Sequence, residues 1–198
     1  MPRRKNQAER RAQLIEAAGR AVLEHGAGGA RLTDIAQEAG LTSAAVLYYY
    51  PDVQELLGAV YARGTEQYCV QREEEVAAAG TVEDRLTACV RSGVPRPGPA
   101  EETSRLLYEL APVVLRDEAA AARNTVFIQR QAAMYREVLE EGEDTGCFRL
   151  AAPAAMLARS FVALEDGYGM DVLTGAATPD QVQDWLLTHA HVMTGRAG

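Results

Sequence analysis

Apolar residues recur at helical spacing along almost the whole chain, and this pattern is the strongest constraint on its fold. Near the N-terminus, for example, Leu14, Ile15, Ala18 and Val22 lie on one helical face. In no segment do apolar and polar residues alternate with a period of two, as they would in a half-buried strand. We therefore expect an all-α fold. A chain of 198 residues can bury a hydrophobic core without disulfides or metals.

Capping and turn residues divide this pattern into consecutive helices. The first helix is expected to end near Gly26, and Thr33 is the expected cap of a short second helix. Thr42 or Ser43 caps a third helix, which Pro51 ends. Further helices are expected over residues 53–79, 81–92, 101–115, 117–141, 153–173 and 179–193, with a linker at 94–99.

The two short helices, separated by the turn at Gly40, have the spacing of a helix-turn-helix. In that motif the first helix lies across the DNA backbone, and the second enters the major groove with its N-terminal residues against base edges. An ordinary helical hairpin inside a bundle is the alternative. The residues of the second helix expected to face DNA are Thr42, Ser43, Ala44 and Ala45 at the bases, and Tyr48 and Tyr49 at the phosphates.

The net charge of −8 would by itself argue against nucleic acid as a partner. The distribution of charge reverses this inference, because residues 1–31 hold seven basic and three acidic residues, whereas residues 65–198 hold 12 basic and 21 acidic ones. Arg3, Arg4 and Lys5 are expected to form a flexible arm that contacts phosphates or the minor groove. Residues 1–64 carry eight basic and seven acidic residues, so we expect few phosphate contacts and a shallow salt dependence.

The segments LIEAAGRAVLEHG and ARLTDIAQEAGLTSAAVLYYYPDVQELLGAVY, within residues 10–61, resemble the DNA-binding domain of the TetR family of bacterial repressors. The resemblance implies that Thr33 touches phosphate and that Tyr50 packs between the recognition helix and the next helix. It implies a helix-turn-helix DNA-binding domain at residues 1–52. Two positions depart from the family pattern: Leu47, where Tyr is frequent, and Val53, where Lys is frequent. Both changes remove an expected backbone contact.

Two later stretches, RLLYELAPVVLRDEAAAARN and ALEDGYGMDVLTG, are similar to the C-terminal domain of the BetI-like branch of this family. This similarity implies that residues 53–198 form a helical domain for ligand binding and dimerisation. The last helix carries an apolar stripe that could form a four-helix dimer interface or bury into its own subunit. Its members are Val182, Trp185, Leu186, His189, Val192 and Met193.

Polar residues on apolar helix faces indicate where a small molecule could bind. Gln131 and Glu165 are expected to face inward, where each needs a ligand or a structural hydrogen bond as partner. Glu165 and Asp166 lie near Phe161 and Tyr168, a combination that suits an effector with a cationic or amine group. The expected ligand-binding residues are Tyr68, Cys69, Cys89, Tyr108, Phe127, Gln131, Phe161, Glu165 and Tyr168.

Other classes of function find less support in the sequence. His189 and His191 are two residues apart on one helix and face opposite ways, so no catalytic residue, metal site or cofactor is expected, and the chain is not expected to be an enzyme. A redox or metal sensor that uses Cys69, Cys89 and Cys147 is an alternative, although their spacing matches no metal motif. A helical binding module that has lost DNA binding is another alternative.

These patterns predict a ligand-responsive transcriptional repressor. It is expected to bind a palindromic operator as a homodimer and to leave the DNA when a small-molecule effector binds. The chain contains neither an apolar run long enough to span a bilayer nor the apolar core of a signal peptide. We therefore expect a cytoplasmic protein with no membrane partner.

Overall fold

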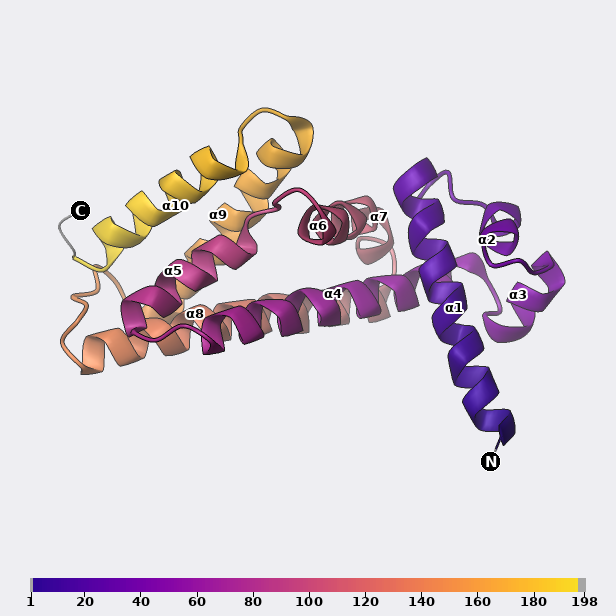
Figure 1. Ribbon diagram of the computed structural model, residues 1–198, viewed down its shortest axis with the longest axis horizontal. Coiled ribbons are helices and arrows are strands. Elements are labelled where there is room, and N and C mark those ends of the chain that lie inside the picture. Colours follow the sequence, from indigo (N-terminus) through magenta and orange to yellow (C-terminus); the bar gives the residue numbers. More distant parts are fainter. Residues whose placement is uncertain (1, 196–198) are drawn as a thin grey trace. The chain divides into compact units, whose positions relative to one another are not determined.

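A computed structural model describes the backbone of residues 2–195 and the side chains of residues 7–195. In this part of the chain the regular structure is entirely helical, so the all-α prediction is confirmed (Figure 1). The helices are α1 (Pro2–His25), α2 (Leu32–Glu38), α3 (Ser43–Tyr49), α4 (Val53–Ala77), α5 (Val82–Gly93), α6 (Pro99–Glu109), α7 (Ala111–Val114), α8 (Glu118–Asp144), α9 (Ala154–Thr174) and α10 (Pro179–Met193).

Local capping chemistry explains where α3, α5 and α10 begin. Thr42 is the N-cap of α3, because its hydroxyl accepts a hydrogen bond from the Ala45 N–H at 3.2 Å. Thr81 caps α5 in the same way. At α10, Thr178 is the cap and Pro179 occupies the first turn, where a missing N–H costs nothing.

The structure corrects two predictions about helix boundaries. Thr33 does not cap α2: the helix begins at Leu32, and the Asp34 carboxylate accepts a hydrogen bond from the Arg31 N–H at 3.0 Å. The single helix expected over residues 101–115 is broken into α6 and α7. Pro112 lies in the first turn of α7, and because it lacks an N–H it cannot continue the hydrogen-bond ladder of α6.

The chain forms two compact units, and the boundaries between them fall within α4, α6 and α8. The first unit contains the residues up to Glu66 together with Arg105–Asn124, and the second contains Gln67–Ser104 and the chain from Thr125 onward. Both α4 and α8 therefore contribute side chains to both cores. The predicted division at residues 52 and 53 concerns which segment contacts DNA, and it stays a prediction.

Each unit has its own hydrophobic core. Leu14 of α1, Ile35 of α2 and Leu56 of α4 are fully buried in the first unit. The second core joins α5, α8, α9 and α10, and in it the rings of Tyr135 and Phe161 stack with centroids 4.8 Å apart. The two cores hold the helices that carry the candidate sites.

Candidate functional site

The turn between α2 and α3 has the geometry of a helix-turn-helix. Gly40 has a positive φ of 64°, which favours glycine, and the Leu41 N–H donates to the Ala36 carbonyl at 2.8 Å. From α1, the Arg11 guanidinium donates to the Tyr49 carbonyl at 2.8 Å, and the Gln13 amide donates to the Ala39 carbonyl at 3.0 Å. The first helix therefore fixes both the turn and the end of α3.

One face of α3 is buried and the other is exposed. Val46 and Tyr50 are buried in the core of the first unit, and the Arg11 guanidinium lies 4.9 Å from the centre of the Tyr50 ring. On the opposite face, Tyr48 is 70% exposed and Leu47 is 41% exposed. Of the residues expected to contact DNA, Thr33, Thr42, Ala44 and Tyr48 are exposed, and Ser43, Ala45 and Tyr49 are partly exposed.

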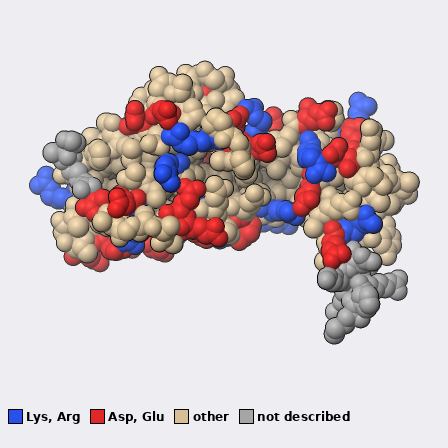
Figure 2. All heavy atoms as spheres, viewed as in Figure 1, with Lys and Arg blue, Asp and Glu red and all other residues tan. Residues whose placement is uncertain are grey.

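The basic residues near the N-terminus have different surroundings. Arg11 holds α3 from α1, and Arg20 pairs with Glu38 of α2 at 2.5 Å. Arg3, Arg4 and Lys5 lie in the first turns of α1, but their side chains lie outside the described residues. Their contact with DNA stays a prediction. Figure 2 shows basic and acidic residues interspersed over the first unit and mainly acidic ones along α4 and α8 in the second.

A buried ion pair lies at the centre of the second unit. Arg72 of α4 is 1% exposed, and Glu165 of α9 is 4% exposed. The guanidinium donates to both carboxylate oxygens of Glu165, at 2.8 and 2.9 Å, a bidentate arrangement. It also donates to the Gln131 Oε1 at 2.9 Å and to the Cys89 carbonyl at 2.9 Å. The Tyr135 hydroxyl donates to Glu165 at 2.6 Å.

Burial dominates the acid–base behaviour of this cluster. It raises the pKa of the Tyr68 hydroxyl and of the Cys89 thiol to about 12 each. Burial also raises the pKa of Glu165, although the guanidinium of Arg72 opposes that shift. Burial lowers the pKa of Arg72, but the Glu165 carboxylate more than compensates and raises it well above the usual value. Arg72 therefore stays a cation inside the core.

Gly93 at the end of α5 makes room for the Glu165 carboxylate. A Cβ atom built on Gly93 would lie 2.0 Å from the Glu165 Oε1. Neither Gly93 nor Arg72 was identified from the sequence. The available signal was the position of Arg72 on the same face of α4 as Cys69 and Val76, which are both buried.

The structure brings most of the predicted ligand-binding residues together. Gln131, Cys89, Tyr68 and Glu165 all bond with Arg72, and Phe161 stacks on Tyr135. Cys69 lines the adjoining recess, and the ring of Phe127 lies 5.6 Å from that of Tyr68. The others lie elsewhere: Tyr168 contacts the Trp185 ring, Tyr108 belongs to the first unit, and Asp166 is exposed. That these side chains bind a ligand stays a prediction.

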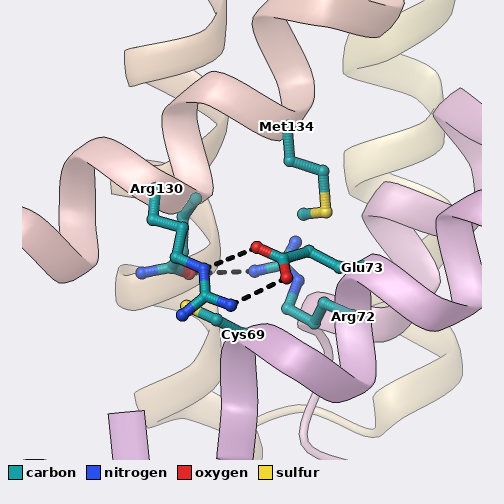
Figure 3. Close-up of a pocket in the computed structure, with 6 residues that line it drawn as sticks. Cys69, Arg72, Glu73, Arg130 and Met134 are labelled. Atoms are coloured by element: carbon teal, nitrogen blue, oxygen red, sulfur yellow. Dashed lines mark hydrogen bonds and ion pairs between the residues drawn. The ribbon is translucent and has the colours of Figure 1, made fainter. Parts of the chain in front are cut away.

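A narrow recess lies beside this cluster, between α4 and α8, and it has no room for a water-sized molecule while its side chains stay in place (Figure 3). Arg130 of α8 binds Glu73 of α4 here with two hydrogen bonds, Nε to Oε1 at 2.6 Å and Nη2 to Oε2 at 2.8 Å. Among the described residues, the Nε2 of Gln131 is a buried side-chain atom with no hydrogen-bond partner. The recess is lined by Cys69, Arg72, Glu73, Arg130, Gln131 and Met134.

Two other kinds of feature are absent from the described residues. No group of three or more His, Cys, Asp or Glu side chains in that part of the chain is arranged to hold a metal ion. None of the helices there has the length and apolar character needed to cross a bilayer.

Known proteins similar to this chain are regulators of transcription. The family model of the BetI-type transcriptional repressor C-terminal domain matches residues 82–195. The transcriptional regulator PksA of Bacillus subtilis (strain 168) is 31% identical over 112 residues, which are 57% of this chain and 46% of that protein. The chain therefore aligns with less than half the length of this relative.

Solved structures share the fold. A TetR transcription regulator from Haloarcula marismortui has a TM-score of 0.83 at 23% identity, covering 94% of this chain and 98% of that chain. A transcriptional-regulator structure from Saccharomonospora viridis, in complex with choline, has a TM-score of 0.84 at 23% identity, covering 91% of this chain and 95% of that chain. With the family model matched over more than half of its length, the chain belongs to the TetR family of transcriptional regulators, in its BetI-type branch.

Proposed function

We propose that this chain is a ligand-responsive repressor that binds a palindromic operator as a homodimer and releases it when a small-molecule effector binds in the second unit. The exposed face of α3 carries this proposal. Tyr48 is 70% exposed, while Val46 and Tyr50 on the opposite face anchor the helix in the core. Small residues at its start, Ser43 and Ala44, leave room for close approach to base edges.

Exposed apolar side chains on α9 and α10 support a dimer. Trp185 is 44% exposed and Val192 is 63% exposed on α10, and Met170 of α9 is 43% exposed. The predicted stripe is divided, because Val182 and Leu186 are buried in the core of their own subunit. A two-fold dimer presents two recognition helices, and these would read two half-sites about one turn of DNA apart.

Two observations on the charge of the effector point in opposite directions. A choline complex of a protein with the same fold favours a cationic effector, as the adjacent Glu165 and Asp166 do in the sequence. In this chain, however, Arg72 already supplies a cation to Glu165. An added cation would have to displace a guanidinium that makes several buried hydrogen bonds.

A cysteine-based sensor has less support. Only the thiolate form reacts readily, and burial raises the pKa of Cys89 to about 12. Cys69 is buried as well. Neither thiol has the solvent exposure of a reactive cysteine.

Selection from random DNA tests the proposed function. The purified full-length protein, without ligand and at low salt, should enrich one palindrome whose half-sites are about one helical turn apart. Scrambling one half-site should lower the affinity by tenfold or more, by about 1.4 kcal/mol at least. If no palindrome is enriched, the proposal is wrong.

A further inference from the structure

The polar side-chain atoms around Arg72 have hydrogen-bond partners within the cluster, with one exception. Both oxygens of Glu165 accept hydrogen bonds from the guanidinium, and Oε1 also accepts one from Tyr135. The Cys89 carbonyl and Gln131 Oε1 accept the remaining strong bonds of Arg72. Because Glu165 is already neutralised, this cluster has no spare negative charge for a cationic ligand.

The exception is the amide nitrogen of Gln131. Its Oε1 must face Arg72, because the reversed amide would place two donors against each other. The NH₂ group is therefore turned away from Arg72 and has no partner, and Gln131 is one of the residues that line the recess. Gln131 is 3% exposed, so water does not readily replace that partner. The buried group with unused capacity is a donor, and a donor needs a ligand oxygen.

The outer side of the recess holds a carboxylate that can be exchanged. Glu73 and Arg130 are joined in a bidentate pair, but their side chains are 43% and 33% exposed. Hydrogen bonding to Arg130 lowers the pKa of Glu73, so Glu73 is ionised at neutral pH. A ligand carboxylate could take the same position on Arg130 while Glu73 turns into water. Such an exchange replaces one carboxylate by another and costs little.

We propose that the effector of this chain carries a carboxylate, which binds between the Gln131 amide and the Arg130 guanidinium after displacing Glu73. This proposal rests on the proposed function and names the chemical class of its effector. Met134 and Cys69 line the same recess, and they provide contacts for an apolar tail. The recess has no room for a water-sized molecule in this conformation, so the carboxylate enters only when the Glu73 and Met134 side chains move aside.

The test compares ligands that differ only in their head group. The probes are hexanoate, hexanamide and hexylamine, with acetate, butyrate and octanoate to vary the tail, each added to the full-length protein in a thermal-shift measurement. At about ten times its Kd, hexanoate should raise Tm by about 3–6 °C. Hexanamide should bind at least about tenfold more weakly, because it lacks the charge that Arg130 recognises. Equal shifts for hexanoate and hexanamide, a larger shift for hexylamine, or no shift for any carboxylate would overturn the proposal.

Two variants assign the binding to these residues. Gln131→Glu keeps an oxygen facing Arg72 but replaces the free donor by a carboxylate oxygen, so it should weaken hexanoate binding at least about tenfold. Glu73→Gln removes the competing carboxylate, so it should tighten hexanoate binding about tenfold. Since this variant gains affinity, a folding defect cannot imitate its result. The matched control is Arg136→Gln, which removes an exposed arginine of an ion pair on the same helix and should leave the hexanoate Kd unchanged.

The variants also give results that contradict the proposal. It is wrong if Glu73→Gln leaves the affinity for hexanoate unchanged, or if Gln131→Glu binds hexanoate as the unmodified chain does. Failure of the proposed function is visible separately in the DNA selection. A selected palindrome with no carboxylate binding leaves the repressor intact and removes this effector class. Carboxylate binding with no selected DNA supports this effector class and shows that the proposed repressor function is wrong.

Discussion

At the scale of single residues, the buried pair of Arg72 and Glu165 is the feature that sequence analysis reached only in part. Glu165 and Gln131 were expected to need inward partners, because both lie on apolar helix faces. Their common partner, Arg72, lies 93 residues before Glu165. Periodicity describes one helix at a time, so it indicated the polar positions but not which helix supplies the charge that satisfies them.

Gly93 should tolerate no side chain. Gly93→Ala places a Cβ against the Glu165 carboxylate, which cannot turn away without breaking its bonds to Arg72 and Tyr135. We expect a loss of about 1–3 kcal/mol in the free energy of unfolding, measured by urea denaturation at a fixed protein concentration. The control is Gly167→Ala on α9, where the added Cβ meets nothing within 4 Å and a small gain, up to about 1 kcal/mol, is expected. Equal effects at the two positions would contradict the steric explanation.

Thiol reactivity should distinguish the three cysteines. Cys147 is exposed, whereas Cys69 and Cys89 are buried and burial raises the pKa of Cys89 to about 12. At pH 8 Cys89 is therefore almost wholly protonated in the folded chain, and its thiolate fraction rises only as the pH approaches 12. A thiolate-specific reagent should modify one cysteine rapidly in the native protein and all three in denaturant. Cys147→Ser should remove the rapid phase, and a rapid phase that persists would revive the sensor alternative.

At the scale of secondary-structure elements, caps and turn glycines made most helix boundaries predictable, because those signals are local. The Thr42 cap and the Gly40 turn are confirmed in this way. The Thr33 cap failed because the helix begins before it: the Asp34 and Ile35 N–H groups already donate to the Arg31 carbonyl. The break between α6 and α7 was missed, although Pro112 lies inside the expected helix and lacks the N–H that would continue its hydrogen-bond ladder.

The exposed face of α3 should be essential for DNA binding but not for folding. Ala44→Glu places a carboxylate at the start of the helix, where it would face the negatively charged groove. Operator affinity should fall at least about tenfold, by about 1.4 kcal/mol or more, while Tm stays within about 2 °C because Ala44 is exposed. Gel-shift titration and thermal unfolding measure these two effects. Ala78→Glu, an equal change at an exposed position after α4, should leave both unchanged.

At the scale of the whole molecule, the sequence predicted the fold class and the family more completely than the arrangement of the units. Helical periodicity requires no knowledge of distant contacts, and the conformation of the α2–α3 turn depends on neighbouring residues. The composition of the compact units does not follow from neighbouring residues. Residues 105–124 belong to the first unit although they follow 38 residues of the second. That grouping depends on the side chains of Leu110, Val113 and Ala120, which pack into the first core. No local sequence pattern predicts that residues 105–124 pack into the first core.

The proposed dimer depends on which exposed apolar residues a second copy of the chain covers. Val192 of α10 and Val126 of α8 are 63% and 62% exposed, so replacing either by Glu costs each protomer about the same. If α9 and α10 form the interface, Val192→Glu buries a charge between two copies and should shift the protein toward monomer, with loss of palindrome binding. Val126→Glu should leave a dimer. Sedimentation velocity at micromolar concentration distinguishes these outcomes: a dimer in both variants, or a monomer only for Val126→Glu, would move the interface away from α10.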